Sequence, residues 1–266
     1  MTRARSSSNK AKIARRVIEV LEFFDDDHRE ATVMDIVRRY DRPQSSTSEL
    51  LSSLVELGIL NKDPHSRSYS LTPRAALLGT SGQPEMVRDG RLVRMMDRLV
   101  AQTGHTVCLI GMVGLDAQVV AWRKGSRDSV YDEQLAGGVK QPLTELAAGW
   151  LLLSTRDASR RDGMIRRLNA EADESRKFGY SEMVARVADC GERLHVAGPA
   201  GFGTNAGIVC ALVPRQPDSH PLAIGILHRA DSKVDPEGLV QCIGDAMRHC
   251  LPEIDEGNVQ QFPHAA

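Results

Sequence analysis

The chain has 266 residues, of which 41% are hydrophobic and 26% charged, and its net charge is −1. These values are typical of a soluble globular protein with room for two domains. The five cysteines are odd in number and include no Cys-x-x-Cys pair, which argues against a disulfide framework and a zinc finger and favours a reducing cytoplasm. No apolar run approaches the roughly 20 residues of a membrane span, and the basic N-terminus lacks the apolar segment of a secretory signal.

The first sixteen residues are basic and contain no acidic residue; their charges are Arg3, Arg5, Lys10, Lys12, Arg15 and Arg16. We expect residues 1–10 to form a flexible arm. Two interpretations stay open: a solubilising tail, or an arm that contacts the phosphates of a nucleic acid.

Three short helices are predicted next. Apolar residues recur at spacings of three and four from Ile13 to Phe24, and a second amphipathic helix follows Thr32 and Asp35, which resemble a capping box. The break at 41–43 precedes a third helix with leucines at 50, 51, 54 and 57, and Gly58 is suited to the position after its end. The order helix, helix, tight turn, helix predicts a helix-turn-helix.

The start of the third helix is polar, and a β-hairpin is predicted after it, on either side of the turn at 63–66. A hairpin in this place is the wing of a winged helix-turn-helix, whose side chains contact DNA backbone phosphates. Short polar side chains leave the helix N-terminus open to a phosphate or a base edge. The candidate DNA-binding residues are Arg15, Arg42, Gln44, Ser45, Ser46, Thr47, Ser48, Lys62, His65 and Arg67.

The rest of the chain has a mixed pattern. A linker and one amphipathic helix from about Glu85 to Gln102 precede apolar strands at 107–113 and 118–122. Thr144 is predicted to cap a very apolar helix over 145–154, and a helical pattern returns at 157–177. Strands are expected near 193–197, 207–213 and 222–228, with a last helix after Asp235 and Pro236. The glycines at 201–203 formally match a dinucleotide fingerprint, but a strand follows them, so we predict a glycine-rich hairpin.

The run TVMDIVRRYDRPQSSTSELLSSLVELGILNKDPHSRSYSLTPRAALLG resembles the DNA-binding domain of the IclR family of bacterial regulators. PLTELAAGWLLLS lies where that family has a Pro-Leu-His-x-x-x-x-Gly-Lys helix, and FGYSEM and LHVAGPA match its Arg-Gly-Tyr segment and Ala-Ala-Pro strand more loosely. The resemblance covers roughly residues 11–254. It implies an α+β chain with a GAF-like effector-binding domain, a homodimer or homotetramer, and control of a catabolic operon by a small organic molecule.

On this basis we divide the chain into a basic arm (1–10), a winged helix-turn-helix domain (11–79), a linker and linker helix (80–103), an effector-binding domain (104–254) and a polar tail (255–266). The family's effector site falls by position on the start of the 145–154 helix and on the strand at His195. The resemblance therefore implies the effector-binding candidates Leu146, Ala147, Ala148, Trp150, Met183 and His195, with plain core positions as the alternative for all but His195. His195 itself could be a core histidine whose hydrogen bonds are satisfied.

The sequence departs from the family pattern at informative positions. Glu49 replaces the usual Arg of the recognition helix; it could accept a hydrogen bond from cytosine N4, or complete a capping box with Ser46. Trp150 replaces the family's Lys, Glu145 lies one position after the usual His, and Arg186 lies where acids are usual. These changes favour an anionic or aromatic effector.

We therefore expect a cytoplasmic, ligand-responsive transcription regulator that binds double-stranded DNA and requires no cofactor or metal. An enzyme of the GAF-like domain is one alternative, with little support because no catalytic constellation is recognisable. A thiol redox sensor using Cys108 or Cys210 is another, although thiols in apolar strands are unreactive by default.

Overall fold

The computed structural model describes residues 9–25, 28–78, 82, 85–127, 131–135, 138–214 and 220–251. Residues 1–8 of the predicted arm, most of the linker at 79–84 and the whole of the predicted tail lie outside these ranges. The chain divides into two compact units, Met1–Gln83 and Pro84–Ala266, and each folds around its own hydrophobic core.

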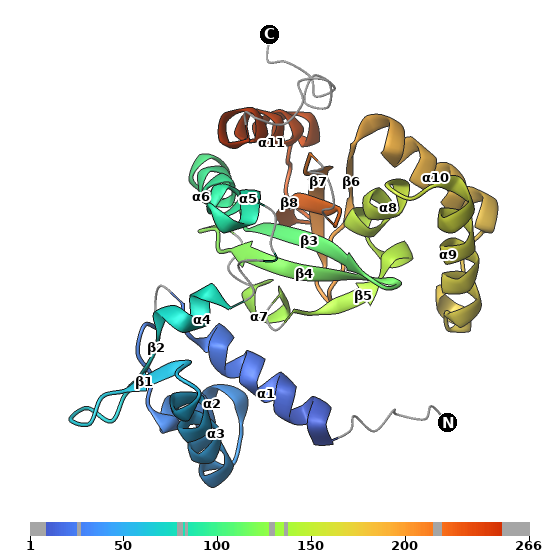
Figure 1. Cartoon of the computed structure of the whole chain (residues 1–266). Coiled ribbons are helices and arrows are strands. Elements are labelled where there is room, and N and C mark those ends of the chain that lie inside the picture. Colours follow the sequence, from blue (N-terminus) through green and yellow to red (C-terminus); the bar gives the residue numbers. More distant parts are fainter. Residues whose placement is uncertain are drawn as a thin grey trace. The chain divides into compact units, whose positions relative to one another are not determined.

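The first unit consists of helices and one small hairpin (Figure 1). Its elements are α1 (Asn9–Phe23), α2 (Val33–Tyr40), α3 (Gln44–Glu56), β1 (Leu60–Lys62), β2 (Tyr69–Leu71) and α4 (Pro73–Leu77). The hairpin is antiparallel, with Leu60 opposite Leu71, and Ala31 adds a bridge to Tyr69. The predicted winged helix-turn-helix is confirmed.

The core of this unit joins every part of the motif. Val20 of α1, Ile36 of α2, Leu51 and Leu54 of α3, and Tyr69 of β2 are all buried in one cluster. Each buried side chain of this size contributes about 1.5–3 kcal/mol to folding. The two helices of the helix-turn-helix and the hairpin are therefore held in one fixed arrangement.

The second unit is built around a six-stranded antiparallel sheet in the order β5-β4-β3-β8-β7-β6. The strands are β3 (Val107–Val113), β4 (Asp116–Arg123), β5 (Lys140–Pro142), β6 (His195–Pro199), β7 (Ala206–Leu212) and β8 (Leu222–Arg229). The helices are α5 (Glu85–Arg88), α6 (Arg91–Thr103), α7 (Asp132–Leu135), α8 (Ala147–Ser154), α9 (Ala158–Glu171), α10 (Tyr180–Arg193) and α11 (Pro236–Cys250), with short 3-10 helices η3 (Leu143–Glu145) and η4 (Glu174–Arg176).

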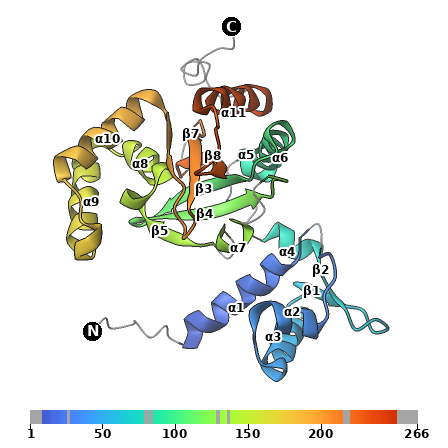
Figure 2. The ribbon, with the colours of Figure 1, turned by 180° about the vertical axis from the view of Figure 1, so that it is seen from behind.

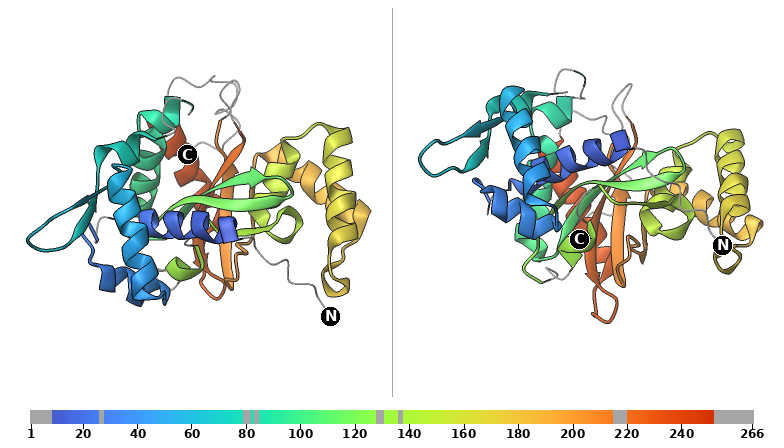
Figure 3. Two further views of the ribbon diagram at one scale, coloured as in Figure 1. Left: turned by 60° about the horizontal axis from the view of Figure 1, so that its bottom comes forward. Right: turned by 90° about the horizontal axis from the view of Figure 1, so that it is seen from below.

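Each face of the sheet has its own core. α8, α9 and α10 pack on one face through residues such as Leu151, Ile165 and Val187. α6 and α11 pack on the other face through residues such as Leu99 and Ile243. Figures 2 and 3 show the two groups of helices on opposite sides of the sheet. The α+β class predicted for this part of the chain is confirmed.

Several local predictions were wrong. The single helix expected from Glu85 to Gln102 is broken between α5 and α6 at Gly90, whose φ of +74° ends one helix before the next begins. Thr144 does not cap the following helix, because it lies inside η3, and α8 begins only at Ala147. The residues of α10 were not predicted to be helical. The hairpin with positive φ at 201–203 agrees with the prediction that these glycines form a turn.

Candidate DNA-binding surface and effector site

The turn between α2 and α3 is set by local hydrogen bonds. Thr32 and Asp35 form the predicted capping box: the Thr32 backbone and side chain donate to the Asp35 carboxylate, at 2.8 Å and 2.7 Å. These two bonds lower the pKa of Asp35. α2 ends at Asp41 in the left-handed conformation, and Pro43 then precedes the first residue of α3. The backbone geometry of the helix-turn-helix is thus fixed at both ends of α2.

The first turn of α3 presents a polar surface. Its N-cap, Pro43, offers no side-chain hydrogen bond, so the first N–H groups of α3 have no capping acceptor. Gln44 and Ser45 are exposed there, and Ser46 and Ser48 are half-buried. Thr47 is buried, and its hydroxyl donates to the Pro43 carbonyl at 3.0 Å. Among the predicted DNA-binding residues, Thr47 is therefore inaccessible and serves the core instead.

The prediction of a capping box formed by Ser46 and Glu49 is wrong. α3 begins at Gln44, so Ser46 lies inside the helix, where its hydroxyl donates to the Pro43 carbonyl at 3.2 Å. Glu49 is exposed on the same helix. Its alternative role, accepting from a cytosine, stays a prediction.

Two residues of α1 contribute to this surface in a way that the sequence did not reveal. Arg16 donates from Nη2 to Oγ of Ser46 at 3.2 Å. The two carboxylate oxygens of Glu19 accept hydrogen bonds from Nη2 of Arg42, at 3.0 Å and 3.1 Å, and hold that guanidinium against α1. Arg15 is exposed. The Arg16–Ser46 and Glu19–Arg42 contacts join residues 30 and 23 positions apart, so no local sequence pattern could have indicated them.

The wing is a tight, hydrogen-bonded turn. The Asp63 carboxylate accepts from the backbone N–H groups of His65 and Ser66, at 2.7 Å and 3.3 Å, and these bonds lower its pKa. Lys62, His65 and Arg67 are all exposed, as a phosphate-contacting role requires. The Lys62 ammonium lies 5.4 Å from the centre of the Tyr69 ring, a cation–π contact that directs its side chain.

The predicted effector-binding residues of α8 are packed in the core. Leu146, Ala147 and Ala148 are fully buried, and Met183 and Trp150 are almost so. Gly198 of β6 lies directly against this helix, since a Cβ built on it would be 3.1 Å from that of Ala147. A ligand at the start of α8 would therefore have to displace packed side chains.

Two contacts hold the side chain of Trp150. Its indole Nε1 donates to the Thr144 carbonyl at 2.8 Å, and the guanidinium of Arg186 lies 4.6 Å from the ring centre. Arg186 in turn pairs with Glu182 at 2.7 Å. An aromatic ring and a cation thus replace the Lys of the family pattern at the end of α8 nearest to η3.

His195 does not join the other effector candidates. On β6, Val196 belongs to the core beneath α8, and strand alternation turns His195 to the opposite face. Its partner in register is Ala211, which lies in the core beneath α6 and α11. Burial lowers the pKa of His195, and Glu237 of α11 opposes that shift. The predicted grouping of His195 with Leu146–Ala148 is therefore wrong, because the sheet separates them.

The three buried cysteines, Cys108, Cys190 and Cys210, give no sign of a reactive thiol. Cys108 and Cys210 are buried, and burial raises the pKa of Cys108 to about 12 and that of Cys210 well above its usual range. Cys190 is similar, with a pKa raised to about 11. Neutral, buried thiols react slowly with oxidants, which disfavours the redox-sensing alternative. Within the described ranges, no cluster of three or more His, Cys, Asp or Glu residues could hold a metal ion.

The fold and surface define a class: a winged helix-turn-helix DNA-binding protein with a separate α+β domain. Residues 14–64 match the family model of the IclR helix-turn-helix domain. The DNA-binding unit of this chain is therefore a helix-turn-helix domain of the IclR type. No helix in the described part of the chain has the length and apolar character needed to span a membrane.

Solved structures show the same fold over most of the chain. An IclR homolog from Microbacterium hydrocarbonoxydans, complexed with 4-hydroxybenzoate, has 17% identity and a TM-score of 0.58, covering 91% of this chain and 98% of that one. A regulator from Alicyclobacillus acidocaldarius has 20% identity and a TM-score of 0.56, with coverages of 92% and 98%. The IclR protein of Thermotoga maritima has 15% identity and a TM-score of 0.56, with coverages of 91% and 97%. A search of curated proteins gave no match to this sequence.

Proposed function

We propose that this regulator binds a specific DNA operator as a homodimer or homotetramer and releases or engages it in response to a small organic acid or aromatic metabolite. The observation that carries the proposal is the uncapped, polar first turn of α3, where Gln44 and Ser45 are exposed beside an exposed basic wing. Uncapped N–H groups and short polar side chains favour contact with phosphates and base edges.

In this proposal α3 lies in the major groove, and Lys62, His65 and Arg67 contact the backbone. Gln44, Ser45 and Ser46 read bases, with Ser48 at the edge of the contact. Arg15 adds a phosphate contact from α1. Arg42 acts indirectly, because Glu19 already occupies its guanidinium.

The effector is proposed to bind at the start of α8, near Leu146, Ala147, Ala148 and Trp150. Two observations support an aromatic carboxylate. The N-cap of α8, Leu146, provides no side-chain acceptor, which suits a carboxylate, and Trp150 provides an aromatic face nearby. The homolog from Microbacterium hydrocarbonoxydans is complexed with a compound of this class. Because the residues are buried, ligand binding requires local repacking, which is a means of coupling the ligand to a conformational change.

Two measurements test the proposal. A selection from randomised duplexes should recover one sequence, with two half-sites if the protein binds as a dimer; failure to enrich any sequence would overturn the DNA-binding part. A thermal-shift screen of aromatic and aliphatic carboxylates, beginning with 4-hydroxybenzoate, should raise the melting temperature by mass action. Ala148→Leu adds bulk at the packed start of α8 and should abolish that rise, with Ala170→Leu at an exposed position of α9 as the matched control.

A further inference from the structure

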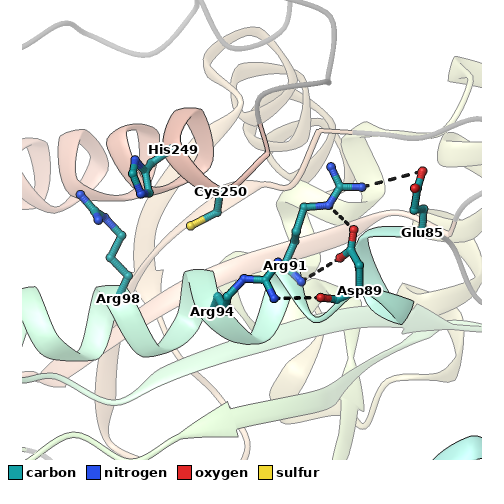
Figure 4. A pocket seen from close by; sticks show the side chains of 7 residues that line it. All are labelled: Glu85, Asp89, Arg91, Arg94, Arg98, His249 and Cys250. Carbon is teal, nitrogen blue, oxygen red and sulfur yellow. Dashed lines mark hydrogen bonds and ion pairs between the residues drawn. The ribbon is translucent and has the colours of Figure 1, made fainter.

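A basic pocket lies in the second unit on the face of the sheet opposite α8 (Figure 4). It has a volume of about 460 Å³, within the range of small-molecule sites. Its walls come from α5, α6 and the last turn of α11, and its lining residues are Glu85, Asp89, Arg91, Arg94, Arg98, His249 and Cys250.

Three arginines dominate this pocket. Arg91, Arg94 and Arg98 are spaced by three and four residues on α6, so they lie along one side of the helix. In Figure 4, Arg98 extends from α6 toward His249 of α11. The last carbonyl groups of α11 carry partial negative charge, so the attraction for an anion comes from the guanidinium groups of α6.

The two acidic residues of the pocket, Asp89 and Glu85, both lie against Arg91. Asp89 forms an ion pair with Arg91 at 2.5 Å and also accepts from the Arg91 backbone N–H at 2.9 Å. Glu85 lies 3.9 Å from Arg91 on the same side. Arg94 donates to the Asp89 backbone carbonyl at 2.9 Å and forms no ion pair within the described structure. Arg91 is thus paired with a carboxylate, whereas Arg94 interacts with the Asp89 charge without an ion pair and Arg98 pairs with neither acid of the pocket.

Among the three arginines of the pocket, Arg98 has the fewest hydrogen-bond partners in the described part of the chain. Its Nε is buried and makes no hydrogen bond within the described structure. Four other arginines also have a buried nitrogen without a hydrogen bond, but each forms another contact: Arg42 with Glu19, Arg91 with Asp89, Arg156 with Met112 and Arg248 with Asp245. A buried N–H group without an acceptor is costly, so Arg98 is the guanidinium of this pocket that would gain most from an oxyanion.

We propose that this pocket binds a small polyanion, a molecule whose carboxylate or phosphate groups carry about two or more negative charges at neutral pH, through Arg94 and Arg98, with His249 closing the opposite wall. Guanidinium groups pair with such oxyanions through two parallel hydrogen bonds. The bound anion links α6 to α11. It thereby stabilises α5 and α6, the first elements of the second unit after the DNA-binding unit in the chain. This site is separate from the proposed effector site at α8, since the two lie on opposite faces of the sheet.

The test uses the full chain and two probes, citrate and inorganic phosphate, in calorimetric titration and thermal shift at constant ionic strength. The wild type should bind at least one probe and melt at a higher temperature in its presence. Preference for citrate or for phosphate identifies which chemistry the site selects. Arg94→Gln and Arg98→Gln should each weaken binding about ten-fold or more, as expected for loss of a hydrogen bond to a charged group.

Arg160→Gln is the matched control, because Arg160 is exposed on α9 and makes the same change of charge on the other face of the sheet. It should bind the probes as the wild type does. If Arg98→Gln does not fold, Arg98→Lys is the alternative variant. It keeps the charge but lacks the planar guanidinium that forms two parallel hydrogen bonds, and it should bind the probes less tightly than the wild type. The proposal is overturned if neither probe binds better than chloride, or if the Arg94 and Arg98 variants bind both probes normally. Binding of 4-hydroxybenzoate by the Arg98 variant reports on the α8 site independently.

Discussion

Arg16 of α1 and Ser46 of α3 are joined by a hydrogen bond of 3.2 Å, from the guanidinium Nη2 to the hydroxyl Oγ. The same hydroxyl donates to the Pro43 carbonyl, so Ser46 is held from both sides. A residue of the first helix therefore sets the orientation of a side chain on the proposed DNA-reading surface.

The first prediction concerns this pair. Arg16→Gln should weaken binding to the selected operator by about 1 kcal/mol, roughly five-fold in Kd, because it removes the hydrogen bond that orients Ser46. Ser46→Ala should weaken binding at least as much, because it removes that bond and the proposed base contact. The double variant should be little weaker than Ser46→Ala alone, since residues that share one contact are not additive. Fluorescence anisotropy with a labelled operator gives all four constants. Fully additive losses would show that Arg16 contacts DNA independently of Ser46.

A second prediction separates base contacts from phosphate contacts. Gln44→Ala should change the preferred base at one or two operator positions, at a cost of about 1–3 kcal/mol for the original sequence. Lys62→Ala should weaken binding to all sequences alike and reduce the slope of log K against log salt by about one. Both side chains are exposed, so the free energy of unfolding should change by no more than about 0.5–1 kcal/mol, the value of the Lys62–Tyr69 cation–π contact. A Lys62 variant with altered sequence preference would contradict this assignment of the wing.

The sequence was sufficient for some of the features that depend on neighbouring residues. The capping box of Thr32 and Asp35, the hairpin around Asp63 and the turn at Gly201 all depend on residues a few positions apart, and the structure has each of them. Five of the six strands of the sheet were predicted for the same reason, because apolar runs mark buried strands, whereas β5 was not predicted.

Relationships across the sheet could not be predicted in this way. His195 was grouped with Ala147 by position in a family pattern, but only the register of β6 with β7 shows which face it occupies. The partners of Arg42 and Ser46 in α1 are likewise determined by helix packing. The sequence did not predict the basic pocket between α6 and α11, although its arginines recur at helical spacing. The reason is that His249 and Cys250, on its other wall, come from about 150 residues further along the chain.

The capping box supports a prediction of pH dependence. Thr32→Ala should reduce the free energy of unfolding by about 1 kcal/mol at pH 7. The Thr32 bonds depress the pKa of Asp35 below its ordinary 3.8 in the folded state, so their stabilisation is complete above pH 3.8 and is lost as the pH falls through the lower folded value. Urea denaturation of wild type and variant should therefore differ by a constant amount from pH 7 to about 5. The difference should narrow below pH 3.8, and an unchanged difference there would rule out the carboxylate's part.

The last prediction compares two helical glycines. A Cβ built on Gly149 of α8 would lie 2.0 Å from the Leu143 carbonyl oxygen, whereas one on Gly163 of α9 would meet nothing within 4 Å. Gly149→Ala should destabilise the second unit by about 3 kcal/mol or more, because backbone of η3 must move. Gly163→Ala should stabilise it by about 0.5–1 kcal/mol, since alanine loses less conformational entropy in a helix.

These free energies correspond to a fall in Tm of roughly 6–12 °C for the Gly149 variant and a rise of about 1–4 °C for the Gly163 variant. Calorimetry of the full chain measures both. The opposite signs matter, because helix propensity favours alanine at both positions and only the close approach of η3 distinguishes them. A stabilised Gly149→Ala protein would mean that η3 does not pack on α8 in solution. The same displacement of η3 would also move the Thr144 carbonyl that holds the Trp150 indole, so the variant should lose any response to 4-hydroxybenzoate at the α8 site.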